Sequence, residues 1–464
     1  MQIFNTLTRQ KEEFIPQTPG EYRIYVCGPT VYNYIHVGNA RPMIVFDTLR
    51  RYLEYRGNKV YYVSNITDID DKLIAKGQQE GVSMQEVARK FEAEYIKDSE
   101  GLNVMEPTVR PRATEHIGEI IKIVKDLVAS GHAYPARNGD VYFRVKSDPG
   151  YGKLSHLNLD DLESGNRALR SQMDDDLKED PADFAVWKAA KPGEPYWNSP
   201  WGHGRPGWHI ECSAMARKHL GNTIDLHCGG QDLIFPHHEN EIAQSECANG
   251  CTFSRYWMHN GFLNINNQKM SKSANNFFTV REIADKYGYE PIRYFMLTAG
   301  YRMPLNYTVE LIESCKSSLE RLYTCRDNLD FAIEHAHGTD TTLVEKANAA
   351  KEKFITAMDD DLNTPDALAA IFEFVKEINT LSDAADKASL QAAADMFDEL
   401  TGVLGLVYNR KTSAVPQEVL DLVEERTAAK KAKDFARADA IRTQLTEMGW
   451  SVADTAQGPQ ISKL

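Results

Sequence analysis

The first 70 residues alternate between apolar runs and a stretch with helical spacing. Residues 23–27 and 59–66 are apolar enough for buried strands, and residues 41–55 between them carry an amphipathic helical pattern. A strand, a helix and a second strand predict a right-handed parallel crossover, the unit of a doubly wound sheet. The turn after the first strand therefore lies where such sheets bind nucleotides.

A similar pattern recurs at residue 223, where a short apolar strand leads through a glycine turn into a helix. Pro236 suits the first turn of this helix, because its missing N–H costs nothing there. If the helix begins at Pro236, His237 and Glu241 lie four residues apart on one face. This is the spacing of a pair of metal ligands.

The pattern changes in other places as well. Residues 68–130 are predicted to be helical, whereas residues 131–205 show short strands among Gly, Pro and acidic clusters, which indicates an insertion into the sheet. A helix over residues 208–219 resumes the main fold, and from residue 308 onward the pattern is nearly all helical. An apolar stripe on this bundle is formed by Leu311, Cys315, Leu319 and Leu322.

These patterns together predict the fold class. We expect an α/β fold, a Rossmann-like doubly wound parallel sheet split by an α+β insertion, followed by an α-helical bundle and a small C-terminal domain. The length of 464 residues leaves room for about three domains, each with its own core.

Composition and net charge indicate what kind of protein this is. The chain is 42% hydrophobic, contains no stretch of about 18 apolar residues and begins without a signal sequence, so we expect a soluble, cytoplasmic protein. Seven irregularly spaced cysteines favour a reducing compartment over a disulfide framework. The net charge of −14 argues against a protein that coats nucleic acid, but it leaves room for RNA bound by local basic patches.

Two cysteines are the nearest candidates to complete the His237/Glu241 pair. Cys212 lies in the segment Gly-Trp-His-Ile-Glu-Cys, and Cys27 lies in Val-Cys-Gly-Pro-Thr-Val-Tyr. A set of two thiolates, an imidazole and a carboxylate suits tetrahedral Zn²⁺. The alternative is a His/Glu pair on a solvated helix face and cysteines that belong to the core.

Two further segments carry groups suited to phosphate chemistry. In the turn after the first strand, Gly38 lets a flat base approach the backbone, and His36 can donate to phosphate oxygens. Lys269 and Lys272, three residues apart in a loop, can neutralise phosphates that separate during a reaction. Taken alone, each segment is also compatible with an ordinary polar turn or a solvated loop.

The C-terminal segment contains a basic pattern with two interpretations. Arg426, Lys430, Lys433 and Arg437 share one helical face if the helix is continuous, with Phe435 opposite; alternatively, Asp434 caps a new helix. A basic face beside an aromatic residue could bind RNA phosphates and stack a base, or be an exposed helix side.

Taken together, the motifs resemble a known family. His36-Val-Gly38-Asn39, the Lys269-Met-Ser-Lys272-Ser loop and their order on a split parallel sheet resemble the two nucleotide-binding signatures of class I aminoacyl-tRNA synthetases. The segments Cys-Gly-Pro-Thr-Val-Tyr, Gly-Trp-His-Ile-Glu-Cys-Ser and Phe-Pro-His-His-Glu-Asn-Glu are similar to those of cysteinyl-tRNA synthetases, and the resemblance spans nearly the whole chain. Asn39 stands where the class has a second histidine, so this position supplies no positive charge.

The resemblance implies an activity and the residues that perform it. It implies ATP-dependent attachment of L-cysteine to tRNA-Cys through a cysteinyl-adenylate, by a monomer with no membrane association, with one Zn²⁺ per chain and Mg²⁺ accompanying ATP. The implied zinc ligands are Cys27, Cys212, His237 and Glu241. The implied catalytic residues are His36, Lys269 and Lys272, and the implied ATP-binding residues are His36, Gly38, Asn39, Asp232 and Lys272. The implied substrate-binding residues are Gly28, Thr67 and Trp208, and the tRNA-binding candidates are Phe435, Arg437 and Asp454.

The same resemblance assigns a role to each part of the chain. The expected segments are 1–118, the first half of the catalytic Rossmann domain; 119–204, the connective insertion; 205–250, the second catalytic half; 251–310, the lysine-serine loop and stem-contact region; 311–405, the helical bundle; and 406–464, the anticodon-binding domain. Three alternatives stay open: a related ligase that passes cysteine to an amino sugar, a non-catalytic tRNA-binding relative, and a protein whose zinc is purely structural.

Overall fold

The computed structural model describes residues 1–157, 177–266, 268–269, 278–410, 415–455 and 458–463. The chain divides into two compact units. The first contains Met1–Lys316, Ile355–Ala367 and Val403–Leu406, and the second contains Ser317–Phe354, Leu368–Gly402 and Val407–Leu464.

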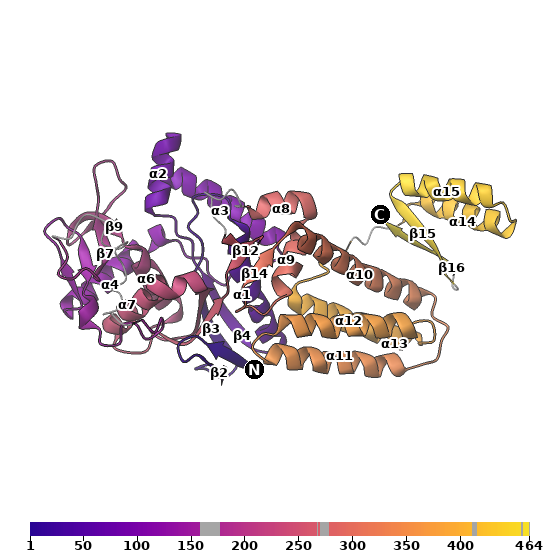
Figure 1. The fold of residues 1–464 in the computed structure, drawn as a ribbon, viewed down its shortest axis with the longest axis horizontal. Coiled ribbons are helices and arrows are strands. Elements are labelled where there is room, and N and C mark those ends of the chain that lie inside the picture. Colours follow the sequence, from indigo (N-terminus) through magenta and orange to yellow (C-terminus); the bar gives the residue numbers. More distant parts are fainter. Residues whose placement is uncertain (158–176, 267, 270–277, 411–414, 456–457, 464) are drawn as a thin grey trace. The chain divides into compact units, whose positions relative to one another are not determined.

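A parallel sheet forms the centre of the first unit (Figure 1). Its strand order is β11-β10-β3-β4, in which β3 is Glu21–Val26, β4 is Lys59–Ser64, β10 is Ile224–Gly230 and β11 is Ser254–Asn260. The strands are mostly buried, as expected when helices cover both faces of a parallel sheet. The predicted doubly wound α/β fold is therefore confirmed.

Three helices connect these strands. Helix α1 (Val37–Tyr55) is the crossover between β3 and β4, α6 (Trp208–Leu220) precedes β10, and α7 (Glu239–Asn249) joins β10 to β11. Between β4 and the insertion lie α2 (Asp71–Glu80) and α3 (Met84–Gly101). The side chain of Asp70 accepts a hydrogen bond from the backbone of Lys72 and so caps α2.

The insertion is an α+β layer with its own core. Helix α4 (Ile117–Ala129) packs with a five-stranded antiparallel sheet whose order is β5-β6-β7-β9-β8. Its strands are β5 (Ala133–Pro135), β6 (Val141–Phe143), β7 (Phe184–Ala189), β8 (Trp197–Ser199) and β9 (Gly202–Pro206). The same core includes Ile210 and Ala214 of α6, so the insertion packs on a helix that also carries site residues.

Smaller elements complete the first unit. An antiparallel pair, β1 (Gln2–Asn5) and β2 (Gln10–Glu13), lies at the N-terminus. After β11, the strands β12 (Leu263–Ile265), β13 (Gln268–Lys269) and β14 (Leu305–Tyr307) form a small sheet. Helices α8 (Val280–Tyr287) and α9 (Tyr289–Leu297) lie between β13 and β14 in the sequence.

The remainder of the chain is largely helical. Its longer helices are α10 (Val309–Glu334), α11 (Thr342–Asp359), α12 (Thr364–Leu381) and α13 (Lys387–Leu404). Cys315, Leu319 and Leu322 are buried, but Leu311 is 44% exposed, so the predicted stripe begins one turn too early. No helix in the described ranges is both long and apolar enough to cross a membrane.

The C-terminal segment differs from the prediction in two respects. Helices α14 (Gln417–Lys431) and α15 (Phe435–Glu447) are separate, because Lys433 adopts a left-handed conformation and Asp434 caps α15. The continuous basic face is therefore wrong, and the capping alternative holds. The chain ends in an antiparallel hairpin, β15 (Trp450–Thr455) and β16 (Gly458–Lys463), where helix was predicted. Trp450 and Val452 of this hairpin pack on Val419 and Ile441, a tertiary contact that overrides the helical pattern.

The structure of the segment after β10 also differs from the prediction of a glycine turn and a helix that begins at Pro236. Gly229 and Gly230 pair with β11 and extend the strand rather than form a turn. A Cβ on Gly229 would lie 2.7 Å from the His238 ring, so this glycine permits the close approach of that imidazole. The regular helix begins at Glu239, and Pro236 lies in the distorted turn Ile234–His238 that precedes it.

Candidate active site

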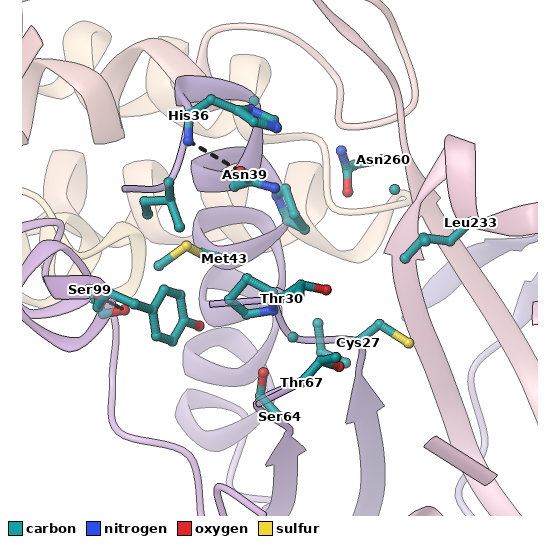
Figure 2. A pocket seen from close by; sticks show the side chains of 18 of the residues that line it. Cys27, Thr30, His36, Asn39, Met43, Ser64, Thr67, Ser99, Leu233 and Asn260 are labelled. Atoms are coloured by element: carbon teal, nitrogen blue, oxygen red, sulfur yellow. Dashed lines mark hydrogen bonds between the residues drawn. The ribbon is translucent and has the colours of Figure 1, made fainter. Parts of the chain in front are cut away.

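A cavity of about 500 Å³ opens at the carboxyl ends of β3, β4 and β10. Figure 2 shows labelled lining residues from several elements, among them Cys27 after β3, Asn39 on α1, Thr67 after β4 and Leu233 after β10. In a parallel sheet these ends are adjacent, and the crevice beyond them is the usual place for a ligand.

The first turn of α1 forms one wall of this cavity. His36 is the residue that precedes the helix, and its backbone N–H donates to Asn39 Oδ1 at 3.2 Å (Figure 2). Gly38 and Asn39 belong to the first helical turn, whereas the sequence pattern placed them in the preceding loop. Helix N-termini carry partial positive charge and unpaired N–H groups, so this wall suits an anionic ligand.

Gly28 holds the ends of β3 and β4 together. A Cβ at this position would lie 1.6 Å from the carbonyl oxygen of Asn65, and the backbone N–H of Gly28 donates to Asn65 Oδ1 at 2.9 Å. Only glycine allows such an approach, and the contact sets the position of the neighbouring Cys27.

Four candidate ligands converge beside the cavity. The ligand atoms of Cys27, Cys212, His237 and Glu241 all lie within 4.8 Å of one another. The two sulfurs are 3.8 Å apart, Cys27 Sγ is 3.6 Å from Glu241 Oε1, and His237 Nε2 is 3.0 Å from the same oxygen. Two thiols, an imidazole and a carboxylate form a donor set that fits Zn²⁺.

A second group of potential ligands shares two of these residues. Cys27, His227, His238 and Glu241 also lie within 4.8 Å of one another. His238 Nε2 is 3.3 Å from Cys27 Sγ, and His227 Nε2 is 2.8 Å from Glu241 Oε2. However, Cys27, Cys212 and His237 line the cavity, whereas His227 and His238 are completely buried and do not. A metal bound by the first set would therefore be accessible to a substrate.

Buried hydrogen bonds orient the imidazoles. His237 Nδ1 lies 2.9 Å from His209 Nδ1, which leaves His237 Nε2 directed at the ligand cluster. Burial and His237 lower the pKa of His209 well below its usual range, so His209 stays neutral and can accept a hydrogen bond from His237 Nδ1. His238 Nδ1 lies 2.8 Å from His259 Nε2, and His259 Nδ1 lies 2.8 Å from the hydroxyl oxygen of Thr6.

The charges within the cluster favour metal binding. A hydrogen bond from Cys27 lowers the pKa of the Cys212 thiol to about 6, while burial raises that of Cys27 well above its usual range. Burial opposes ionisation of Glu241, but His227 and His237 hold its pKa at about 2. At neutral pH the cluster therefore offers a thiolate and a carboxylate, the forms that bind a metal. Burial opposes the charge on His237, but Glu241 and Cys212 raise its pKa to about 10, so metal binding would release a proton from this imidazole.

The predicted substrate-binding residues lie around this cluster. Trp208, at the start of α6, is 42% exposed and its ring centroid lies 4.3 Å from that of His237. Thr67 Oγ1 donates to Glu211 Oε2 at 3.3 Å, and burial raises the pKa of the Glu211 carboxyl well above its usual range. Asp232 lies in the turn after β10 and lines the cavity.

Other predicted residues lie elsewhere or outside the described ranges. Lys269 ends β13, where its backbone pairs with Asn264, and Lys272 lies outside the residues that the structure describes. In the C-terminal segment Phe435 is 61% exposed. Arg437 pairs with Glu425, and Asp454 pairs with Arg426 and Lys430, so both charged candidates already have partners in their own module.

Sequence reasoning missed several residues that shape the site. His209 lies inside the segment Gly-Trp-His-Ile-Glu-Cys, and His227 lies in the strand that begins near residue 223, but no role was predicted for either. Only the fold brings these rings and that of His259 to the cluster. Arg41 was also missed: it is fully buried in α1 and donates to the carbonyl oxygens of Gly261, Phe262, Gly300 and Met303. Its signal was an arginine on the apolar face of a helix. Cys228, which had no predicted role, is a buried residue of β10 outside both ligand groups.

Comparisons with protein families cover most of the chain. A model described as the class I (C) tRNA synthetase catalytic domain matches residues 13–317. A DALR domain model matches residues 353–408, and a model of the cysteinyl-tRNA ligase anticodon-binding domain matches residues 412–461.

Individual proteins are similar over the full length. The chain is 54% identical over 469 residues to the cysteine–tRNA ligase of Caldicellulosiruptor saccharolyticus, with 100% of both chains covered. It is 53% identical to that of Clostridioides difficile, with 99% of both covered. Among solved structures, Mycobacterium tuberculosis methionyl-tRNA synthetase with methionyl-adenylate superimposes with a TM-score of 0.61 at 17% identity, covering 83% of this chain and 89% of that one. An Agrobacterium radiobacter LeuRS in a ternary complex gives 0.60 at 11% identity, covering 85% and 86%. These two likenesses concern the fold alone.

Proposed function

Because this chain belongs to the cysteine–tRNA ligases of the class I synthetases, we propose that it attaches L-cysteine to tRNA-Cys through a cysteinyl-adenylate formed from ATP. The observation that carries the proposal is the convergence of Cys27, Cys212, His237 and Glu241 within 4.8 Å beside a cavity whose opposite wall is a helix N-terminus. One end of the cavity suits a thiol and the other suits a phosphate.

In the proposed first step the cysteine carboxylate attacks the α-phosphate of ATP, which forms the cysteinyl-adenylate and releases pyrophosphate. His36 and the N–H groups of the first turn of α1 stabilise negative charge as it develops on the phosphate oxygens. Lys272, helped by Lys269, serves the same purpose from its loop, and ATP enters with Mg²⁺. Gly38 and Asn39 accommodate the base, and Asp232 holds the ribose hydroxyls. In the second step a hydroxyl of the terminal ribose of tRNA attacks the acyl carbonyl, and AMP leaves.

Selection of cysteine is proposed to depend on the ligand set. A hydroxyl is smaller than a thiol, so a pocket fitted to cysteine by shape alone would reject serine by only about 1–3 kcal/mol. Zn²⁺ bound by Cys27, Cys212, His237 and Glu241 would supply a preference for a soft thiolate over a neutral hydroxyl. Gly28, Thr67 and Trp208 would line the remainder of the amino-acid site.

The anticodon would be recognised by the C-terminal segment, where Phe435, Arg437 and Asp454 remain candidates. The family matches over residues 353–408 and 412–461 support a tRNA substrate over an amino sugar, because a ligase for a small sugar needs no anticodon-binding domain. We retain the predicted division of the chain into catalytic halves, insertion, bundle and anticodon-binding segment as part of this proposal.

The test is charging of total tRNA with cysteine and ATP, with serine as the control amino acid. We expect charging with cysteine only, loss of charging in Cys212→Ser, and unchanged charging in Cys251→Ser, whose exposed thiol lies outside the cluster. Failure of the intact, metal-loaded chain to form either adenylate or charged tRNA would refute the proposed function.

A separate measurement distinguishes a substrate-binding metal from a structural one. In protein loaded with Co²⁺ instead of Zn²⁺, added cysteine should increase the thiolate-to-metal charge-transfer absorption, and serine should not. A spectrum that does not respond to cysteine would assign the metal a structural role only.

A further inference from the structure

Arg281, in the first turn of α8, binds two neighbouring helices of the first unit. Its Nε donates to Asp98 Oδ1 of α3 at 2.8 Å and to the Tyr289 hydroxyl oxygen of α9 at 3.0 Å. Its Nη2 lies 2.8 Å from Glu94 Oε2, also on α3. The Tyr289 hydroxyl donates in turn to Asp98 Oδ1 at 2.7 Å. These contacts tie α8 to α9 and to α3, beside which it lies (Figure 1).

Helix stability does not explain an arginine at this position. The first turn of a helix carries partial positive charge, so carboxylates are favoured there and cations are not. Helix α8 already has a cap, because the side chains of Thr279 and Glu282 each accept a hydrogen bond from the backbone N–H of the other. The partner of Arg281 on α3, Asp98, is completely buried, and a buried carboxylate needs a charged or hydrogen-bonded partner. The arginine is therefore explained by the contact between α8 and α3.

The segment that enters α8 pairs with the segment that enters α1. Two backbone hydrogen bonds, each 2.9 Å long, join residues 35–37 to residues 278–280. They place His36 opposite Thr279 in an antiparallel bridge. Because Thr279 is also the residue that caps α8, the position of α8 fixes the backbone that carries the His36 side chain.

Arg281 also contacts the segment before His36 directly. Its guanidinium carbon lies 5.5 Å from the ring centroid of Tyr34, two residues ahead of His36. The same ring meets Phe91 of α3 edge-on, with ring centroids 5.6 Å apart. Because a cation is attracted to an aromatic face, Tyr34 is held between Arg281 and α3. Arg281 therefore acts on both strands of the bridge, on Tyr34 through its side chain and on Thr279 through the backbone of α8.

We propose that Arg281 is a positioning residue for His36: together with Asp98 it holds the paired entries of α1 and α8, so that the imidazole stays directed at the α-phosphate. Among the described residues, His36 lines the cavity and Arg281 does not, so the arginine acts through the histidine. This inference rests on the proposed function, which gives His36 the task of stabilising negative charge on the phosphate oxygens.

The first measurement is cysteine-dependent ATP–pyrophosphate exchange in Arg281→Met. Misplacement of a catalytic group by about 1 Å can cost about 100-fold in rate, so kcat should fall at least about tenfold. The KM for cysteine should change less than twofold, because Arg281 does not touch the ligand cluster. Arg281→Lys keeps the charge but not the planar fork of donors, so its kcat should be intermediate. If Arg281→Met does not fold, Arg281→Lys serves for the same comparisons; exchange within twofold of the wild-type value in the folded variant would overturn the proposal.

Arg326→Met is the matched control. Arg326 also pairs with two carboxylates, Asp398 at 2.8 Å and Asp330, but it lies on α10. Exchange should change less than twofold in this variant, even where the Tm falls as much as in Arg281→Met. An equal loss of exchange in the two variants would trace the effect to general destabilisation and would overturn the proposal.

A double variant tests whether Arg281 acts through His36. In a His36→Ala background, Arg281→Met should lower kcat much less than it does in the wild-type chain, because the group that it positions is already absent. The same factor in both backgrounds would show that the two residues act independently, and the proposal would be wrong.

A readout without catalysis separates this inference from the proposed function. In protein labelled with ¹⁵N-histidine, the backbone amide signal of His36 should shift in Arg281→Met, whereas that of His203 on β9 should not. An unshifted His36 signal would overturn the positioning role. Failure of the wild-type chain to catalyse exchange would refute the proposed function, while the NMR comparison would still decide whether Arg281 positions His36.

Discussion

His209 provides a sharp test of how the fold prepares the ligand cluster. Its Nδ1 lies 2.9 Å from His237 Nδ1, and His237 Nε2 lies 3.0 Å from Glu241 Oε1. In His209→Phe an aromatic ring is kept at this position, and the new ring can keep the edge contact that His209 makes with Phe184. The acceptor for the His237 proton is removed, so His237 is free to change tautomer or to rotate.

The magnitude follows from the kind of interaction that is removed. Loss of a hydrogen-bonding partner of a metal-binding histidine typically weakens metal affinity 10–100-fold, which corresponds to about 1.4–2.7 kcal/mol. We therefore expect Zn²⁺ affinity in His209→Phe to fall within this range, and His209→Gln, which restores an acceptor, to recover part of the loss. The assay is competition for Zn²⁺ against a chelating dye at neutral pH.

The control is His203→Phe, because His203 stacks on Tyr196 in the insertion and belongs to neither ligand group. Circular dichroism verifies that each variant is folded. If folded His209→Phe bound Zn²⁺ as tightly as the wild-type chain, the inference that His209 orients His237 would be wrong.

Three further predictions concern the framework around the site. Gly28→Ala places a Cβ 1.6 Å from the Asn65 carbonyl oxygen. In urea unfolding, the free energy of unfolding should therefore fall by at least about 2 kcal/mol, and Zn²⁺ binding should weaken. A variant as stable as the wild-type chain that still binds the metal would contradict the close approach. Arg293→Met leaves the buried Asp47 with Arg51 as its remaining ion-pair partner in the described chain, so the free energy of unfolding should fall by roughly 3 kcal/mol in the same assay. A loss below about 1 kcal/mol would be the contrary result. Arg426 and Lys430 hold the pKa of Asp454 well below its usual range. The stability that this pairing contributes is therefore present above the ordinary carboxyl pKa of about 3.9 and is lost as the pH falls through the lower pKa of the folded state. The ¹³C chemical shift of the carboxyl carbon should titrate below about 3.9, and a midpoint at or above that value would rule out the pairing.

Packing explains why Arg41 and Arg293 escaped prediction. Both are fully buried, and each donates to carbonyl oxygens of segments distant in sequence: Arg41 to Gly261 and Met303, and Arg293 to Leu102 and Leu404. A helical pattern indicates that a position faces the core, but it does not show which carbonyl oxygens will accept hydrogen bonds from the side chain there. Arg41 holds Gly261 and Phe262, which line the cavity, and only the folded chain reveals that role.

The sequence by itself determined the local helices and strands and the kinds of side chain available as ligands. The period of the apolar residues was enough to predict β3, α1, β4 and the bundle, because strand and helix formation depend on side chains within a few residues of one another. The donor types at Cys27, Cys212, His237 and Glu241 suggested a metal, and the motifs around them identified the family, although the site itself stays a prediction.

Tertiary structure alone decided which distant groups meet. Cys27 and Cys212 are 185 residues apart in sequence, and their sulfurs lie 3.8 Å apart because helix α6, which contains Cys212, packs against β3, the strand that Cys27 follows. The buried histidines and the C-terminal hairpin depend in the same way on strand order and core packing. Such contacts are selected by the free energy of the whole fold, which no local pattern records.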